Sequence, residues 1–138
     1  MIRTLSRLTS EIANNLSYSS SDRVSELLFK PQSSIYYYSG VTKTYGEKVT
    51  NLFTDVTSLD TLSYTQEYNN VEIITIYINT SNELSKYIDL NLFSDLKKLK
   101  YVYIIGKAAS NEGQITKMVQ NLDPKYGVFY KIPKDDNY

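Results

Sequence analysis

The chain contains neither cysteine nor histidine, and these two absences exclude much of enzyme chemistry. Without cysteine there is no disulfide framework, no thiolate metal site and no thiol redox chemistry. Without histidine the chain lacks the side chain that most often serves as a general base near neutral pH and as a metal ligand. Any catalysis would rest on carboxylates, lysine, tyrosine or hydroxyl groups. The composition therefore favours a non-catalytic protein with no metal and no cofactor.

Long hydrophobic runs are missing as well. The longest apolar run surrounds residues 102–105, far short of the roughly 20 residues that a membrane span requires, so we expect a soluble chain with no membrane span. The segment that begins at Met1 and ends at Leu16 holds no continuous apolar stretch and no small-residue cleavage site, which argues against a signal peptide. We expect a cytoplasmic protein if Met1 is the native start and an exported one if a leader precedes this sequence. Compartment and oligomeric state stay open.

Charge is balanced overall but unevenly placed. Residues 51–96 hold seven acids against one lysine, whereas residues 97–138 hold eight lysines against four acids. A nucleic-acid partner needs a dense basic stripe, and only Lys97, Lys98 and Lys100 lie close together in the sequence. We therefore predict no nucleic-acid partner. The charges either solvate helices and loops or orient a protein partner.

The length of 138 residues and the 41% apolar content indicate one domain with a substantial core. We divide it into a helical N-terminal segment (1–30), a mixed segment (34–68) and a strand–helix unit (71–133). Apolar residues at helical spacing predict one helix near the N-terminus and a second, short helix before Pro31. The first helix would bury Leu5, Leu8, Ile12 and Leu16, and the second Val24, Leu27 and Leu28.

The mixed segment begins with a predicted strand at 35–38. The Ser39-Gly40 turn favours a hairpin with residues 41–45. A helix is then predicted over residues 49–56, from the spacing of Val49, Leu52, Phe53 and Val56.

Alternating strands and helices follow from residue 71 onward. Strands are predicted at 71–78, 101–105 and 127–133, with one helix between each pair. The first helix would use the face Leu92, Phe93, Leu96 and Leu99, and the second would cover 113–122. This β-α-β-α-β order predicts an α/β fold with a parallel sheet. The strands are apolar on both faces, so we expect the N-terminal helices to pack on the second face.

Two of these strands repeat the same apolar spacing. Residues 71–79 and 99–107 share aliphatic residues at equivalent positions, and a third, weaker copy falls at 127–135, after the same interval. The pattern LxxLxLxxN over 71–135 resembles leucine-rich repeats. It is complete at Val71, Ile74, Ile76 and Asn79, has Lys107 in place of the asparagine in the second copy, and in the third has Gly127 and Asp135 at the first and last positions. The alternative is an ordinary α/β sandwich whose two steps have equal length.

The chain is tyrosine-rich, with 14 tyrosines and no tryptophan. Biased codon composition explains an excess of Tyr, Asn, Ile and Lys, yet Tyr36-Tyr37-Tyr38 is notable, because successive strand residues point to opposite faces. At least one of these rings should reach the surface. Tyrosine is favoured at protein interfaces, so we predict a protein-protein interaction module. Its candidate binding residues are Tyr36, Tyr37, Tyr38, Tyr45, Tyr101 and Tyr103.

A small-ligand or anion binder is the second functional hypothesis. In parallel sheets, ligands bind beyond the carboxyl ends of the strands, where helix N-termini present backbone N–H groups. Two polar loops meet that description, or serve only as caps and turns. Their residues are Asn79, Thr80, Ser81 and Asn82 in the first loop and Gly106, Lys107, Ser110 and Asn111 in the second.

A small hydrolase that uses carboxylates is the third hypothesis. The candidate pairs are Asp89 with Asp95 and Asp135 with Asp136. The first pair is too far apart along the chain to converge, and the second sits near the C-terminus. Phosphate-loop, dinucleotide and nucleophile-elbow motifs are all missing. The sequence therefore favours recognition of another protein over catalysis.

Overall fold

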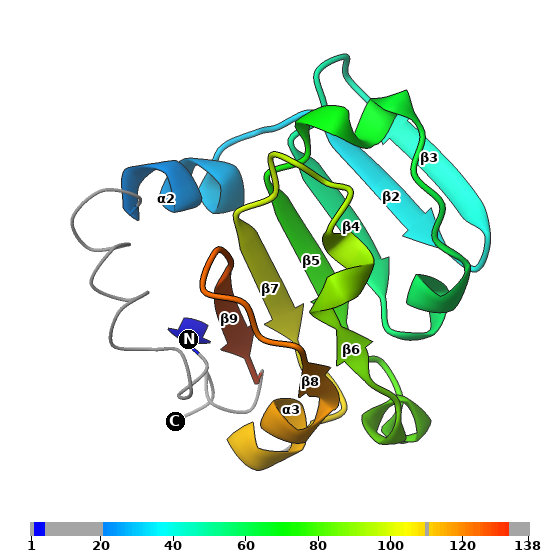
Figure 1. Cartoon of the computed structure of the whole chain (residues 1–138), viewed down its shortest axis with the longest axis vertical. Helices are drawn as coiled ribbons and strands as arrows, with labels where there is room; N and C mark the ends of the chain where they lie inside the picture. The colour runs from blue at the N-terminus through cyan, green and yellow to red at the C-terminus, as the bar shows by residue number, and fades with distance from the viewer. Residues whose placement is uncertain (1, 5–20, 110, 133–138) are drawn as a thin grey trace.

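The computed structural model describes residues 2–4, 21–109 and 111–132, which build a seven-stranded sheet (Figure 1). The α/β class predicted from the sequence is confirmed. In spatial order the strands are β1 (Ile2–Thr4), β9 (Gly127–Lys131), β7 (Tyr101–Ile105), β5 (Ile73–Tyr77), β4 (Asn51–Asp55), β2 (Ser34–Tyr38) and β3 (Val41–Tyr45). A two-stranded sheet pairs β6 (Ile88–Asp89) with β8 (Val119–Gln120). The helices are α2 (Ser21–Phe29) and α3 (Glu112–Met118), and the 3-10 turns are η3 (Thr57–Thr61), η4 (Gln66–Asn70), η5 (Ser81–Ser85) and η6 (Leu90–Phe93).

Five strands of the large sheet are parallel and follow one another in chain order. β2, β4, β5, β7 and β9 are successive neighbours, while β3 and β1 pair antiparallel at the two edges. Each crossover therefore moves the chain one strand in the same direction. Because such crossovers are nearly always right-handed, they collect on one face of the sheet. Figure 1 looks onto that face, where α3, β6 and β8 lie over the strands.

The main core lies between this face and the connecting segments. Strand residues such as Ile74, Ile76 and Val102 are completely buried there. The connections contribute Leu59, Phe93 and further apolar side chains to the same cluster. These residues share one face because successive side chains of a strand point to opposite sides of the sheet.

The second face of the sheet is partly covered by α2. Leu27 packs with Ile73, Tyr101, Tyr103 and Phe129, and Val24 and Leu28 lie against this cluster. The expectation that Leu27 and Leu28 pack on the second face is thus confirmed. The first predicted helix, with Leu5, Leu8, Ile12 and Leu16, lies outside the described residues.

The helix predicted over residues 49–56 is wrong, because residues 51–55 form β4. Leu52 and Thr54 are buried on the core face, and Phe53 points to the second face. A strand that is covered on both faces has apolar residues at odd and even positions. The spacing of its apolar residues can therefore resemble that of an amphipathic helix. β4 lies between β2 and β5, and pairing with two neighbours overrides the local pattern.

The helix predicted with the face Leu92, Phe93, Leu96 and Leu99 is also wrong. The segment forms η6 and then turns, in which the N–H of Leu96 bonds to the C=O of Phe93 and the N–H of Leu99 to the C=O of Leu96. These bonds span three residues, and a three-residue spacing fits 3-10 turns better than an α-helix. The second predicted helix is present but shorter, since α3 ends at Met118 and β8 follows.

The pairing of the parallel strands shows which residues of β9 are equivalent to the repeated apolar positions of β5 and β7. Ile73 pairs with Tyr101, at the interval that separates the first two copies of the sequence pattern. Tyr101 pairs in turn with Gly127. The step from Tyr101 to Gly127 is shorter than the step from Ile73 to Tyr101. Val128 and Tyr130, rather than Tyr130 and Ile132, therefore lie beside Val102 and Ile104. The residues of β9 that lie beside the aliphatic residues of β7 therefore come two positions earlier in the chain than a constant interval between copies predicts. The reason is that the connection from β7 to β9 is shorter than the one from β5 to β7.

Helix α2 is fastened to the sheet by an ion pair. Arg23 donates from Nε to Glu72 Oε1 at 3.0 Å and from Nη2 to Glu72 Oε2 at 2.6 Å, and its Nη1 pairs with Glu26. The hydrogen bonds from Arg23 hold the pKa of Glu72 below its ordinary value despite partial burial. The helix is therefore anchored by charge at its first turn and by Leu27 farther along.

Replacing Glu72 with glutamine should loosen α2, because it removes the carboxylate that Arg23 binds through two hydrogen bonds. We expect a loss of about 1 kcal/mol, as for a partly exposed two-point ion pair. Hydrogen exchange of the α2 amides should speed up more than exchange in β5. The exposed Glu67→Gln serves as the control. Unchanged exchange in α2 would show that the ion pair does not hold the helix.

Candidate functional site

The three consecutive tyrosines of β2 divide between the two faces of the sheet. Tyr37 is buried in the main core, where its hydroxyl meets the C=O of Thr61 at 2.9 Å and the Thr61 hydroxyl at 2.7 Å. Tyr36 and Tyr38 point to the second face and are only partly buried. Two of the three predicted binding tyrosines thus reach the surface, and Tyr37 does not.

Strand β3 extends the surface that Tyr36 and Tyr38 begin. The hairpin register sets Val41 opposite Tyr38 and Lys43 opposite Tyr36, and Tyr45 follows on the same face. Val41 is 57% exposed and Tyr45 is 58% exposed. Tyr36, Tyr38, Val41 and Lys43 line a shallow hollow of about 240 Å³.

Aromatic packing joins this hairpin to β4. The ring of Tyr36 meets that of Tyr45 edge-on at 5.6 Å and that of Phe53 at 4.8 Å between centroids. Tilted and edge-on ring pairs of this kind stabilise one another and hold the rings in place. We name this surface the aromatic patch, and its residues are Tyr36, Tyr38, Val41, Lys43, Tyr45 and Phe53.

Tyr101 and Tyr103 lie on the same face of the sheet but are covered. Both are buried, and both belong to the cluster formed with Leu27 of α2 and Phe129. The structure therefore brings Tyr36, Tyr38 and Tyr45 together and places Tyr101 and Tyr103 under a helix.

Sequence reasoning missed Val41, Lys43 and Phe53. Alternation along the predicted hairpin would have found the first two, because every second residue of β3 shares a face with Tyr36. Phe53 was hidden by the incorrect helix.

A polar fringe borders the aromatic patch where the strands end. Burial, with the neighbouring Tyr77 and Asp55, raises the pKa of Tyr38 to about 12. Lys107 places its Nζ over the ring of Tyr77, 4.7 Å from the centroid. A cation held over a ring in this way is stabilised by the ring quadrupole. Lys107 is thus directed at Tyr77.

The two loops of the anion hypothesis lie side by side. The N–H of Ala108 donates to the C=O of Ile78 at 3.0 Å, which ties the loop after β7 to the loop after β5. Asn111 caps α3 by accepting from the N–H of Gln114 at 3.0 Å, and the N–H of Gly106 bonds to the C=O of Lys131 at 2.8 Å. Ser110 lies outside the described residues. The four residues of the first loop are exposed: Asn79, Thr80, Ser81 and Asn82.

An internal carboxylate occupies the N–H groups of the first loop. Glu83 accepts from the N–H of Asn79 at 2.7 Å and of Thr80 at 3.1 Å. It also accepts from the N–H and the hydroxyl of Thr57, both at 2.8 Å. Burial opposes its ionisation, but these hydrogen bonds outweigh burial and lower its pKa. An external anion would have to compete with Glu83 for these donors.

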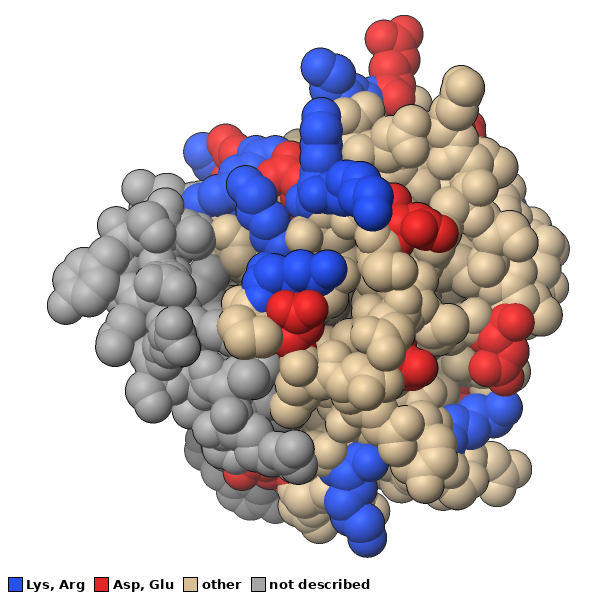
Figure 2. All heavy atoms as spheres, viewed as in Figure 1, with Lys and Arg blue, Asp and Glu red and all other residues tan. Residues whose placement is uncertain are grey.

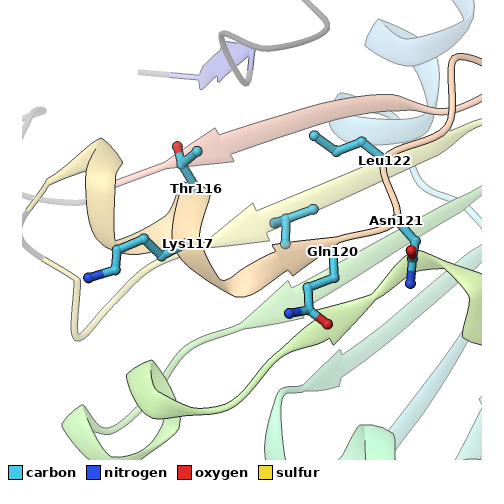
Figure 3. A pocket seen from close by; sticks show the side chains of 6 residues that line it. Thr116, Lys117, Gln120, Asn121 and Leu122 are labelled. Carbon is cyan, nitrogen blue, oxygen red and sulfur yellow. The ribbon is translucent and has the colours of Figure 1, made fainter.

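A larger, open hollow of about 500 Å³ lies beside α3 and β8 (Figure 3). Its lining is one continuous stretch of chain, comprising Thr116, Lys117, Val119, Gln120, Asn121 and Leu122. Figure 3 shows the side chains of Lys117, Gln120 and Leu122 pointing in different directions rather than converging. A specific ligand site needs convergent polar groups, and this hollow lacks them.

Basic side chains gather near the start of the parallel strands, with acidic side chains among them (Figure 2). Lys98 donates to Asn70 Oδ1 at 2.8 Å, and Lys125 lies 3.9 Å from Asp123. Within the described ranges, no group of acidic side chains is arranged to hold a metal ion, and no helix is long and apolar enough to cross a membrane.

Of the carboxylates in the hydrolase hypothesis, Asp89 has a structural role and Asp95 is exposed. Asp89 accepts from the N–H of Asn91 at 2.9 Å and from the side chain of Asn121 at 2.7 Å. Asp135 and Asp136 lie outside the described residues. Comparison with protein-family models, with curated proteins and with solved structures found no match for this chain.

Proposed function

We propose that this chain is a recognition module that binds another protein through the aromatic patch. The observation that carries the proposal is the exposure of Val41 and Tyr45 beside partly buried tyrosines on a regular sheet. Aromatic side chains are enriched at the centres of protein interfaces, where they contribute most of the binding energy. Tyr36 is already wedged between Tyr45 and Phe53, so little side-chain entropy is lost on binding.

The resemblance to leucine-rich repeats remains part of this proposal. We propose that residues 71–133 repeat one unit made of a strand and its connection, as the shared aliphatic spacing of 71–79 and 99–107 predicts. In that family the strand positions between the aliphatic ones form an open surface. On the strands of that unit these positions are held by Ile73, Tyr101, Tyr103 and Phe129, which are buried in the cluster with Leu27 of α2, so binding at the aromatic patch is proposed independently of the resemblance.

Anion binding has less support than protein recognition. The N–H groups of Asn79 and Thr80 are engaged by Glu83, and Lys107 lies over Tyr77. Among the described residues, no segment of the chain covers Val41 and Tyr45 of the aromatic patch in the way that Glu83 occupies the loop N–H groups.

Affinity capture from a lysate of the source cells tests the proposed function. The baits are the wild-type chain, a Val41→Ser/Tyr45→Ser double variant and a Tyr87→Ser control. Tyr87 is 62% exposed but lies just before β6, away from the aromatic patch. We expect a protein that wild type and control retain to bind the double variant about 30-fold more weakly, the effect of losing about 2 kcal/mol at a hot spot.

Both altered side chains are more than half exposed, so the double variant should stay folded and lose only about 1 kcal/mol, the contribution of the ring contact between Tyr36 and Tyr45. Equal capture by all three baits would show that the aromatic patch is not the binding surface.

A further inference from the structure

The outer edge of the sheet beside the aromatic patch is open. β3 is the last strand in the sheet order (Figure 1). All five of its residues are exposed. Among the described residues, no backbone hydrogen bond joins β3 to a segment other than β2. An open edge is a template on which another extended chain can pair.

The hairpin geometry decides which backbone groups face outward. Ser39 and Gly40 both have positive φ, 53° and 79°, and form the two-residue loop between Tyr38 and its partner Val41. In such a loop the closing pair exchanges both hydrogen bonds, and the bonded pairs then alternate along the strands. The N–H and C=O groups of Val41, Lys43 and Tyr45 therefore face β2. Those of Thr42 and Thr44 face away from the sheet.

Residues of η4 contact Thr42 and Thr44, whose side chains lie on the opposite face of β3 from Val41, Lys43 and Tyr45. The hydroxyl of Tyr68 bonds to the side chain of Thr42, and the Thr44 hydroxyl lies 3.4 Å from Glu67 Oε2. Both partners belong to η4. The edge is thus held in extended form before any partner arrives, which lowers the entropy cost of pairing.

Charge argues against a second copy of this chain as the occupant. Antiparallel pairing about a two-fold axis at Lys43 would set two lysines directly opposite each other, which is destabilising. An axis at Thr44 would instead bring two copies of Glu67 together, because each lies close to Thr44. A lysine in the middle of an edge strand is a recognised barrier to self-pairing.

The same lysine favours an acidic partner. Lys43 is the only charged side chain on the outer face of the hairpin, and it has no ion-pair partner among the described residues. Val41 and Tyr45 flank it at a spacing of two residues on the same face, and both are more than half exposed. A strand laid along β3 would therefore meet the order apolar, basic, apolar.

We propose that the partner contributes an extended segment that pairs with the free edge of β3 as an eighth strand. The segment carries an acidic residue opposite Lys43 and apolar residues two positions to either side, which cover Val41 and Tyr45. Its backbone bonds to the outward groups of Thr42 and Thr44. This inference rests on the proposed function and specifies the chemistry of the segment bound.

Selection from a phage-displayed library of random dodecapeptides tests the inference on the full chain. We expect enriched peptides to carry Asp or Glu with aliphatic or aromatic residues at the second position on each side. The most enriched peptide, made synthetically, should slow hydrogen exchange at the Thr42 and Thr44 amides. A copy of it N-methylated at alternate residues should bind at least tenfold more weakly, because it cannot pair on that side.

Charge reversal sharpens the test. Lys43→Glu should weaken the acidic peptide at least tenfold, and a copy of that peptide with lysine for the acid should regain binding. Lys117→Glu, which alters an exposed lysine on α3, should change neither affinity. Absence of enriched peptides, enrichment without an acid, or unchanged exchange at Thr42 and Thr44 would each overturn the inference.

Two further outcomes separate this inference from its premises. If a captured partner is lost with Val41→Ser/Tyr45→Ser yet leaves the Thr42 and Thr44 amides unprotected, the proposed function stands and strand pairing is wrong. Sedimentation equilibrium should show a monomer. A dimer that protects the same two amides would replace the acidic segment with a second copy of the chain.

Discussion

Replacing Glu83 with glutamine is expected to lower the free energy of unfolding by about 3 kcal/mol, because a buried carboxylate that accepts four hydrogen bonds is lost. Glu83 is 3% exposed and joins the loop after β5 to Thr57 at the start of η3. An amide side chain offers one acceptor oxygen where the carboxylate offers two. Its NH₂ group would also face backbone N–H groups that are themselves donors.

Urea denaturation followed by circular dichroism measures the loss. The exposed Glu47→Gln is the matched control and should stay within about 0.5 kcal/mol of the wild type. If Glu83→Gln were as stable as Glu47→Gln, the carboxylate would not hold the two loops together.

The pH dependence of stability follows from the same group. Hydrogen bonds lower the pKa of Glu83 in the folded chain below the ordinary value of 4.5. Its contribution is therefore fully present above about pH 4.5 and is lost as the pH falls through the lower folded-state pKa. The stability gap between wild type and Glu83→Gln should be constant near pH 7 and should narrow in acid. A gap that stayed constant down to pH 2 would contradict the assignment.

Leu27→Ala is expected to cost about 3 kcal/mol, the second large effect. Leu27 is 1% exposed and is the residue of α2 that enters the cluster on the second face of the sheet. Truncation of such a side chain removes its burial energy and leaves a cavity among Ile73, Tyr101 and Tyr103. Phe29→Ala is the control on the same helix, because Phe29 is 72% exposed.

Differential scanning calorimetry and tyrosine fluorescence together check this second prediction. Partial release of α2 should make Tyr101 and Tyr103 more accessible to acrylamide quenching, whereas Phe29→Ala should leave quenching unchanged. Equal stability of the two variants would mean that the helix is not packed on the sheet through Leu27.

Local patterns in the sequence predicted several elements well. The turn at Ser39-Gly40 predicted the β2–β3 hairpin, because only a few residue types accept two consecutive positive φ angles. Short runs that are apolar on both faces predicted β5 and β7, and the two-residue period of a strand gave the direction in which their side chains point. These features depend on residues within two or three positions of one another, so the sequence alone contains the information.

Other features depended on partners distant in the chain. Phe53 belongs to a strand rather than a helix because β2 and β5 bond to it on either side. Phe93, Leu96 and Leu99 are buried as predicted, but they lie in 3-10 turns rather than in an α-helix. Apolar spacing reports which residues are buried more reliably than it reports the backbone that buries them.

The candidate site shows the same division. By itself the sequence determined that the chain lacks thiol and imidazole chemistry and that the tyrosines of β2 alternate between two faces. Only the tertiary structure decided that Tyr37 is core, that α2 covers Tyr101 and Tyr103, and that Tyr36, Tyr38 and Tyr45 share an exposed surface. The reason is physical: side-chain direction follows from the local backbone, whereas exposure depends on which distant segments pack against that side chain.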